Sequence, residues 1–120
     1  MAEKILIVGH SPGKIVKSKS PTRNRVKHWL NSAGIEEYDW TNLVHYNVPS
    51  LKMSDVTLDP KWVMGYDRVI ALGRSAEQWL SRQEIKHLAV PHPSGLNRAW
   101  NDPSVEPEVM DNIKKYLKKS

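Results

Sequence analysis

Short aliphatic runs recur along the chain and end at a glycine or a proline. Three of them are KILIVG (4–9), DRVIALG (67–73) and KHLAVP (86–91). Runs of this length that are rich in Ile, Val and Leu are typical of strands buried inside a parallel sheet. A further run, YDWTNLV (38–44), is predicted to be the second strand in chain order.

Segments with helical spacing of apolar residues lie between and after these runs. Helices are predicted over residues 23–33, 75–82 and 106–118. In the first, the apolar residues fall at i, i+3, i+4 and i+7, which makes one side of the helix apolar. Thr22 or Ser20 is its expected N-cap and Gly34 its expected end. Region 45–66 is predicted to be mostly loop, with one short helix near Pro60–Met64.

The order of these elements predicts the fold class. Strands that alternate with helices pair in parallel, and helices then cover both faces of the sheet. We therefore predict a three-layer α/β/α sandwich with a central four-stranded parallel sheet, in a single domain over residues 1–120. Ligands of such sheets bind beyond the carboxyl ends of the strands. Those ends lead into GHSPG (9–13), TNLVHYN (41–47), LGRSA (72–76) and PHPSGLNR (91–98).

Basic residues are concentrated in the first third of the chain. The formal net charge is +5, and segment 4–35 alone carries +7 because it contains no Asp or Glu. This concentration is the electrostatic pattern expected for a polyphosphate partner such as DNA or RNA. The alternative is a solvated basic face that has no partner.

The composition excludes several classes of site. Because the chain has no cysteine, it has no disulfide, thiolate nucleophile, or cysteine-ligated metal or iron–sulfur centre. The longest aliphatic run, Ile5–Val8, is far shorter than the roughly 20 apolar residues of a membrane span. We expect an intracellular monomer, cytoplasmic or nucleoid-associated, that needs no cofactor and no membrane partner. Its small size and basic segment are compatible with a viral or mobile-element protein.

Three motifs in the strand-end segments occur in an informative order. GHSPG (9–13) follows the first predicted strand, TNLV (41–44) ends the second, and HPSGLNR (92–98) follows the last. Taken together, they resemble the uracil-DNA glycosylase superfamily. Its members carry Gly-x-x-Pro-Gly or Gly-x-x-Pro-Tyr after strand one, an asparagine at the end of strand two, and a late His-Pro-Ser motif before an apolar wedge residue. VIALGRSAEQWL (69–80) is similar to the family's strand, glycine and helix before the last motif.

The resemblance implies an enzyme that extrudes a nucleotide from DNA and cleaves its N-glycosidic bond. His92 would donate a hydrogen bond to the base as negative charge develops on it, and Pro91 and Pro93 would restrict its backbone. Asn42 would bind the pyrimidine edge, because a carboxamide has both a donor and an acceptor. The alternatives are a histidine bonded to backbone carbonyls and an asparagine that closes a strand in an Asx turn.

The resemblance also implies base-binding and DNA-binding roles for the surrounding loops. Leu96 would fill the gap left by the flipped base, although a leucine folded onto the core is an equal alternative. The motif residues expected around the base are Gly9, Pro12 and Gly13. The residues expected to contact DNA are Lys17, Ser18, Lys19, Ser20, Thr22 and Arg23 at a helix N-terminus, and Ser94, Gly95, Leu96, Asn97 and Arg98 after the last strand.

The first motif departs from the family pattern. More active branches place Asp, Asn or Glu in the two positions after the first glycine, whereas this chain has His10 and Ser11. A histidine can act as a base near neutral pH, so His10 with Ser11 is the expected pair that positions water. Gly13 stands where some branches have a tyrosine that excludes thymine's methyl group, so a larger pyrimidine would fit.

Three hypotheses follow. The first is a glycosylase acting on uracil or a modified pyrimidine in single- or double-stranded DNA. The second is a non-catalytic nucleic-acid-binding or nucleotide-binding module on the same scaffold, because the usual acid or amide is missing. The third is an α/β enzyme acting on a small phosphorylated molecule, although the chain has no Gly-x-x-x-x-Gly-Lys-Ser/Thr or Gly-x-Gly-x-x-Gly motif.

Overall fold

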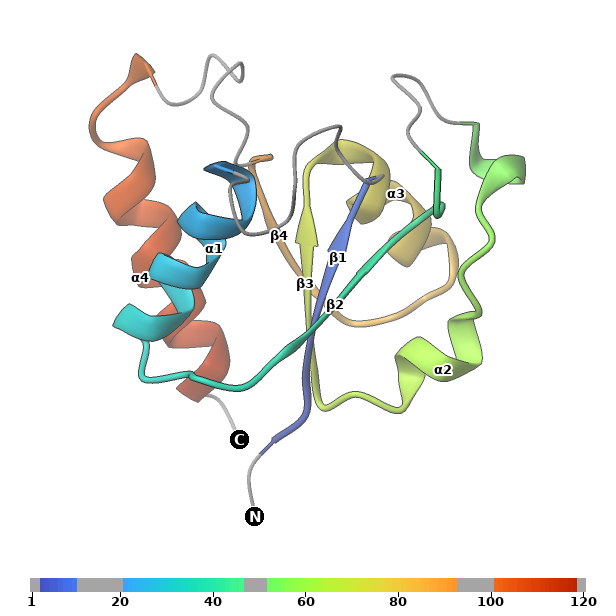
Figure 1. The fold of residues 1–120 in the computed structure, drawn as a ribbon, viewed down its shortest axis with the longest axis horizontal. Coiled ribbons are helices and arrows are strands. Elements are labelled where there is room, and N and C mark those ends of the chain that lie inside the picture. The colour runs from blue at the N-terminus through green and yellow to red at the C-terminus, as the bar shows by residue number, and fades with distance from the viewer. Residues whose placement is uncertain (1–2, 11–20, 47–51, 93–100, 119–120) are drawn as a thin grey trace.

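The computed structural model describes residues 3–10, 21–46, 52–92 and 101–118. Its centre is a sheet of four strands, all paired in parallel, in the order β2-β1-β3-β4. The strands are β1 (Ile5–Gly9), β2 (Asp39–Asn42), β3 (Arg68–Leu72) and β4 (Leu88–Val90). The prediction of an α/β fold around a four-stranded parallel sheet is therefore confirmed, and all four strands end at the same edge (Figure 1).

Both faces of the sheet are buried, because side chains alternate along each strand. On β1, Ile5 and Ile7 belong to one apolar cluster, while Leu6 and Val8 belong to the other. All four side chains are at most 4% exposed. A strand buried on both faces needs apolar residues at every position, which explains the continuous aliphatic run.

Helices cover the two faces separately (Figure 1). On one face, called here the α1 face, lie α1 (Pro21–Ser32) and α4 (Val105–Lys118), which supply buried residues to the first cluster. The opposite face, the α3 face, is covered by α3 (Arg74–Arg82) and by α2 (Pro60–Met64). A single 3-10 turn, Met53–Asp55, precedes α2. Helices on both faces of a parallel sheet make three layers, as the alternating pattern predicts.

The boundaries of α1 differ from the prediction at its start. The helix begins at Pro21, so Thr22 lies inside it and is not the N-cap, and Ser20 falls outside the described residues. Proline is favoured in the first turn because the amide hydrogen that it lacks would have no partner there. Gly34 ends the helix as predicted, with a φ of +83° that favours glycine.

The second strand is shorter than the predicted 38–44. It ends at Asn42, and the next two residues, Leu43 and Val44, leave the strand while staying fully buried. The amide of Leu43 donates to the carbonyl of Gly9 at 3.0 Å, which bends the chain around the end of β1. The apolar residues at 43 and 44 therefore indicate burial and do not indicate strand pairing, since a residue can be buried without belonging to a strand.

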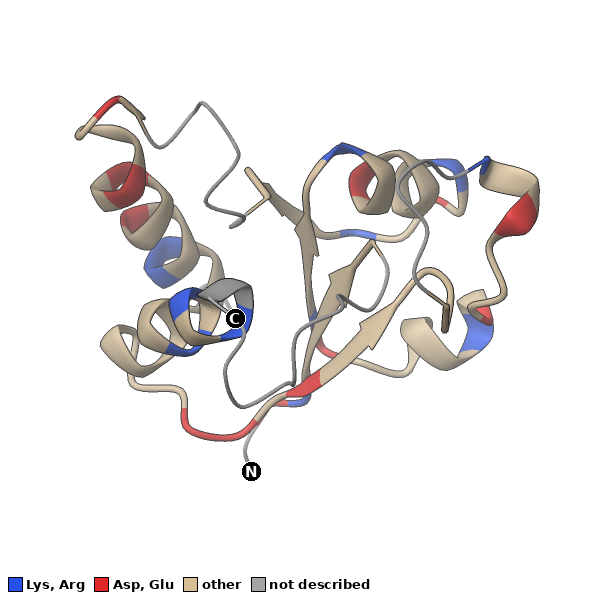
Figure 2. Cartoon of the chain, turned by 45° about the horizontal axis from the view of Figure 1, so that its top comes forward, with Lys and Arg blue, Asp and Glu red and all other residues tan. Residues whose placement is uncertain are grey.

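Part of the basic segment serves a structural role. Arg25 of α1 forms an ion pair with Glu106 of α4 at 3.6 Å, and the indole of Trp29 donates to the same carboxylate at 3.3 Å. Figure 2 shows Lys and Arg residues along α1 and Asp and Glu residues along the neighbouring α4. The net charge of segment 4–35 therefore overstates the charge that is available to a partner. Within the described ranges, every helix is too short or too polar to cross a membrane.

Candidate functional site

The strand order places a candidate site beyond β1 and β3. From β1 the chain goes to β2 on one side, and then crosses to β3 on the other side of β1. Neighbouring connections thus leave in opposite directions, and in open α/β sheets ligands usually bind beyond the carboxyl ends of the strands at such a point. The residues that follow the two strands are His10 and Gly73. Both lie in segments that the sequence singled out.

Asn42 lies directly against Gly9 at the end of β1. The two residues are paired in the sheet register. A Cβ atom added to Gly9 would lie 2.6 Å from Oδ1 of Asn42, a distance that real Cβ atoms do not adopt. The carboxamide therefore occupies the space that a Cβ at this position would fill, so a larger residue than glycine would displace it. The predicted base-binding pair, Asn42 and Gly9, is brought together.

His92 packs on Gly73, the residue directly before α3. Its Cβ and Cδ2 atoms lie 3.2 and 3.3 Å from the position that a Cβ on Gly73 would take. Gly73 also has a φ of +88°, which favours glycine on conformational grounds. Its amide donates to the carbonyl of Val90 at 2.9 Å, which ties the end of β4 to the start of α3. The half-buried imidazole thus packs against backbone that is hydrogen-bonded to the end of β4.

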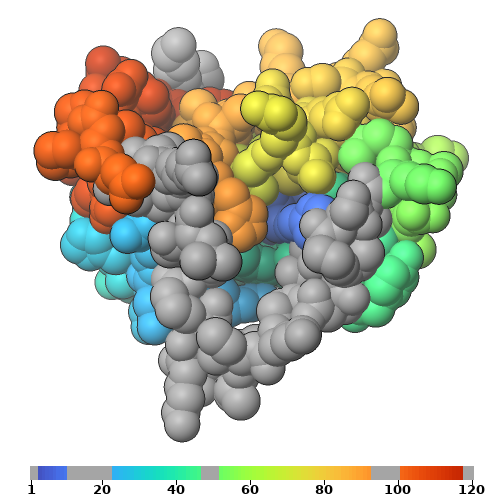
Figure 3. Space-filling model, turned by 90° about the horizontal axis from the view of Figure 1, so that it is seen from above, coloured from blue at the N-terminus to red at the C-terminus, as the bar shows by residue number. Residues whose placement is uncertain are grey.

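His10 and His92 are close enough for their charges to interact. Burial lowers the pKa of His92 below its usual value of 6.5, and the charge of neighbouring His10 lowers it further. Seen from above, the end of β1 (blue) and the residues after β4 (orange) lie side by side on this face (Figure 3). The lowered pKa favours a neutral imidazole at neutral pH, the form that can donate a hydrogen bond without carrying charge into the site.

The lowered pKa of His92 gives a testable pH dependence of stability. As the pH falls below about 6.5, the unfolded chain takes up a proton that folded His92 does not yet bind. The free energy of unfolding should therefore fall with pH below about 6.5, until the pH reaches the lower pKa of the folded state. Urea denaturation of wild-type protein and His92→Gln at a series of pH values measures this loss.

The variant His92→Gln should lose less stability over that range than the wild type. The control variant is His45→Gln, because His45 is an exposed histidine. It corrects for the general effect of removing a histidine. If His92→Gln and wild type lose stability in parallel, His92 is not the group that burial perturbs.

Arg23 lies over the indole of Trp40. Its guanidinium carbon is 4.4 Å from the centre of the ring, which is within cation–π distance. The pKa of neighbouring Tyr38 is raised by burial, and the positive charge of Arg23 partly offsets that rise. Arg23 therefore joins the first turn of α1 to β2, next to Asn42. The backbone of Thr22 also lies in this first turn.

Many of the predicted contact residues lie outside the part of the chain that the structure describes. They are Ser11, Pro12, Gly13, Lys17, Ser18, Lys19 and Ser20 in the first loop, and Ser94, Gly95, Leu96, Asn97 and Arg98 in the last. Their predicted roles stay predictions. The predicted site residues that the structure describes, apart from the backbone of Thr22, are Gly9, His10, Arg23, Asn42 and His92, and all of them lie near the carboxyl edge of the sheet.

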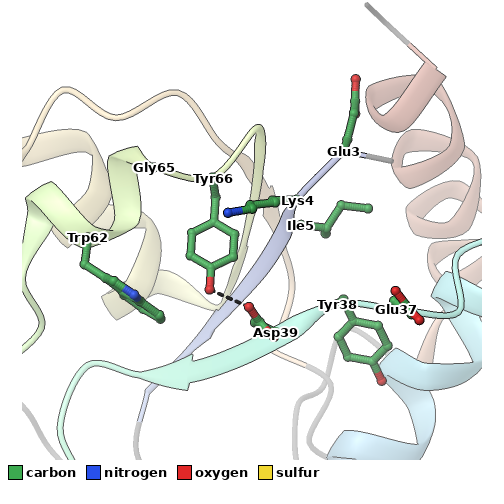
Figure 4. Close-up of a pocket in the computed structure, with 9 residues that line it drawn as sticks. All are labelled: Glu3, Lys4, Ile5, Glu37, Tyr38, Asp39, Trp62, Gly65 and Tyr66. Atoms are coloured by element: carbon green, nitrogen blue, oxygen red, sulfur yellow. Dashed lines mark hydrogen bonds between the residues drawn. The ribbon is translucent and has the colours of Figure 1, made fainter. Parts of the chain in front are cut away.

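A hollow of about 390 Å³ lies at the opposite edge of the sheet (Figure 4). There the hydroxyl of Tyr66 donates to Asp39 at 2.5 Å, and the pKa of Tyr66 rises to about 12 because of burial, this bond and the charge of Asp39. Glu3, at the rim, pairs with Arg68 at 3.2 Å. These polar groups bond to one another and join the amino ends of β1, β2 and β3. We interpret the hollow as a structural junction.

Two residues of the site were missed from the sequence. Gly73 supports His92, and its place after an aliphatic run was the available signal. Trp40 supports both Arg23 and Asn42, and its position two residues before Asn42 on the same strand face was the available signal.

Within the described residues, no group of three potential metal ligands occurs. No family model, curated protein or solved structure matches this chain.

Proposed function

We propose that the protein is a DNA glycosylase that hydrolyses the N-glycosidic bond of uracil or a modified pyrimidine. The observation that carries this proposal is the grouping of Asn42, His10 and His92 around the ends of β1 and β3. These residues are far apart in the sequence and come from three separate motifs of the resemblance. An amide that can bind a base edge and a neutral imidazole at the same ends of the sheet are suitable groups for holding a leaving pyrimidine.

The proposed reaction needs only these groups and water. Water adds its oxygen to the anomeric carbon of the sugar while the bond from that carbon to the base nitrogen breaks. The bonding electrons leave with the base, whose carbonyl oxygen becomes more negative and accepts a hydrogen bond from neutral His92. His10 takes the proton that the attacking water loses. The base anion is then protonated by solvent, so the products are the free base and an abasic sugar.

A non-catalytic nucleic-acid-binding or nucleotide-binding module is the second candidate. The observation that favours it is the absence of Asp and Glu from GHSPG, TNLVHYN, LGRSA and PHPSGLNR, the four segments that follow the strands. A glycosylase usually stabilises the positive charge on the sugar with a carboxylate or an amide. His10 can accept a proton, but it stabilises that positive charge poorly once protonated.

Incubation with synthetic oligonucleotides separates the two candidates. Single- and double-stranded DNA containing uracil, hydroxymethyluracil or a G·T mismatch is treated with the protein and then with alkali, which cleaves at abasic sites. We expect cleavage at the modified position and none in the unmodified control strand. Binding that weakens with salt but yields no abasic product would favour the module instead. If DNA does not bind even at low salt, the glycosylase and a module that binds DNA are both wrong.

A further inference from the structure

Trp40 stands between the two groups that the proposed function assigns to base and phosphate. It lies on the same side of β2 as Asn42, because residues two apart on a strand share a face. Its indole nitrogen donates to Oδ1 of Asn42 at 3.4 Å, and the guanidinium of Arg23 lies 4.4 Å above its ring centre. One indole thus contacts an amide at its edge and a cation on its face.

The edge contact determines which way the carboxamide faces. An indole nitrogen is a donor only, so the atom of Asn42 that meets it must be the oxygen. The amide nitrogen then points away from Trp40, and within the described part of the chain it has no hydrogen-bond partner. The two N–H groups of the Asn42 amide therefore point away from Trp40. They can donate to a carbonyl oxygen on a bound base but not to an exocyclic amino group.

The face contact restricts Arg23 in a different way. A guanidinium is planar and presents its N–H groups as a fork that suits an oxyanion such as a phosphate, and the contact with the ring restricts where that fork lies. Arg23 lies in the first turn of α1, where positive charge and backbone amides already favour anions. The ring thus fixes the distance between a group suited to phosphate and a group suited to a base.

We propose that Trp40 is a positioning residue that holds Asn42 and Arg23 in a fixed relation, so that the site binds the base and a backbone phosphate together. This inference rests on the proposed function. Packing alone would not require the indole nitrogen, because Trp40 is only partly buried and lies at the margin of the α1-face cluster. The bond to Asn42 is what distinguishes tryptophan from phenylalanine at this position.

Two substitutions separate the edge contact from the face contact. Trp40→Phe keeps an aromatic face for Arg23 and removes the N–H, whereas Trp40→Leu removes both. We expect Trp40→Phe to lose about three- to tenfold of the preference for a uracil oligonucleotide over the matching cytosine oligonucleotide, with its salt dependence unchanged. Trp40→Leu should lose this preference, bind both oligonucleotides about tenfold more weakly, and show a shallower salt dependence. Trp62→Phe, at the opposite edge of the sheet, is the matched control and should behave like wild type.

A measurement without DNA keeps this test independent of the proposed function. The side-chain amide signals of Asn42 in a nitrogen–proton NMR spectrum report whether the carboxamide is held. In Trp40→Phe they should shift and exchange faster with solvent than in wild type and in Trp62→Phe. If these signals and the uracil preference are both unchanged, Trp40 does not position Asn42. If uracil DNA binds neither wild type nor variant while the signals change, the positioning by Trp40 holds and the glycosylase proposal fails.

Discussion

Replacing His92 with alanine is expected to lower the rate of base release by about 10²- to 10³-fold, the usual cost of losing one donor to a developing oxyanion. The imidazole is half-buried against Gly73 and its pKa is lowered, so under the proposed mechanism it would meet the leaving base as a neutral donor. Alanine keeps the Cβ atom that contacts Gly73 but removes the ring. Quantified cleavage of a uracil oligonucleotide after alkali, under single-turnover conditions, measures the loss.

The matched control for this prediction is His87→Ala. His87 precedes the same strand, β4, at the opposite edge of the sheet, where its Nδ1 bonds to the carbonyl of Ile85 at 2.8 Å. Losing that bond should cost about 1 kcal/mol of stability and leave the rate unchanged. DNA affinity of His92→Ala should stay within about tenfold of wild type, because the contacts to phosphate are retained. Equal rates for His92→Ala and wild type would remove His92 from the mechanism.

The positions of the strands along the chain were largely predictable, because burial on both faces leaves a continuous aliphatic run in the sequence. Ile5–Val8 shows this most clearly, with two side chains on each face. Convergence of the motifs at one edge also followed, since parallel strands end on the same side. The contact of Asn42 with Gly9 did not follow, because it depends on β2 lying beside β1. Hydrophobic pattern does not encode strand order.

Charge was the less reliable guide to the site. The basic segment contains both Arg23, which lies beside Asn42 on Trp40, and Arg25, which pairs with Glu106 of α4. These two arginines are two residues apart on a helix, so they point in different directions and meet different neighbours. Net charge counts them equally, and only the packing of α1 against α4 separates a structural arginine from a candidate ligand contact.

The two histidines place a limit on the pH at which the proposed site can work. Since the charge of His10 helps to lower the pKa of His92, the two rings disfavour being charged together. The proposed role of His92 as a neutral donor therefore requires a pH above the lowered pKa of this histidine.

Replacing Gly9 with alanine is expected to weaken recognition of the target base by about ten- to a hundredfold while leaving the fold intact. The new Cβ would lie 2.6 Å from Oδ1 of Asn42, so the carboxamide must move away. The backbone bond from Leu43 to the carbonyl of Gly9 needs no change. Stability should therefore change by less than about 1 kcal/mol, because the end of one side chain gives way and the core does not.

A double-mutant cycle with Asn42→Ala tests whether Gly9 acts through Asn42. If it does, Gly9→Ala should have almost no further effect once the carboxamide is gone, so the double variant should match Asn42→Ala alone. Gly65→Ala is the control, because Gly65 lies at the opposite edge of the sheet with a φ of −74° that alanine adopts readily. The measurement is the ratio of affinities for uracil and cytosine oligonucleotides. If the loss of this ratio in the double variant equals the product of the two single losses, Gly9 and Asn42 contribute independently. Gly9 would then not act by leaving space for the amide of Asn42.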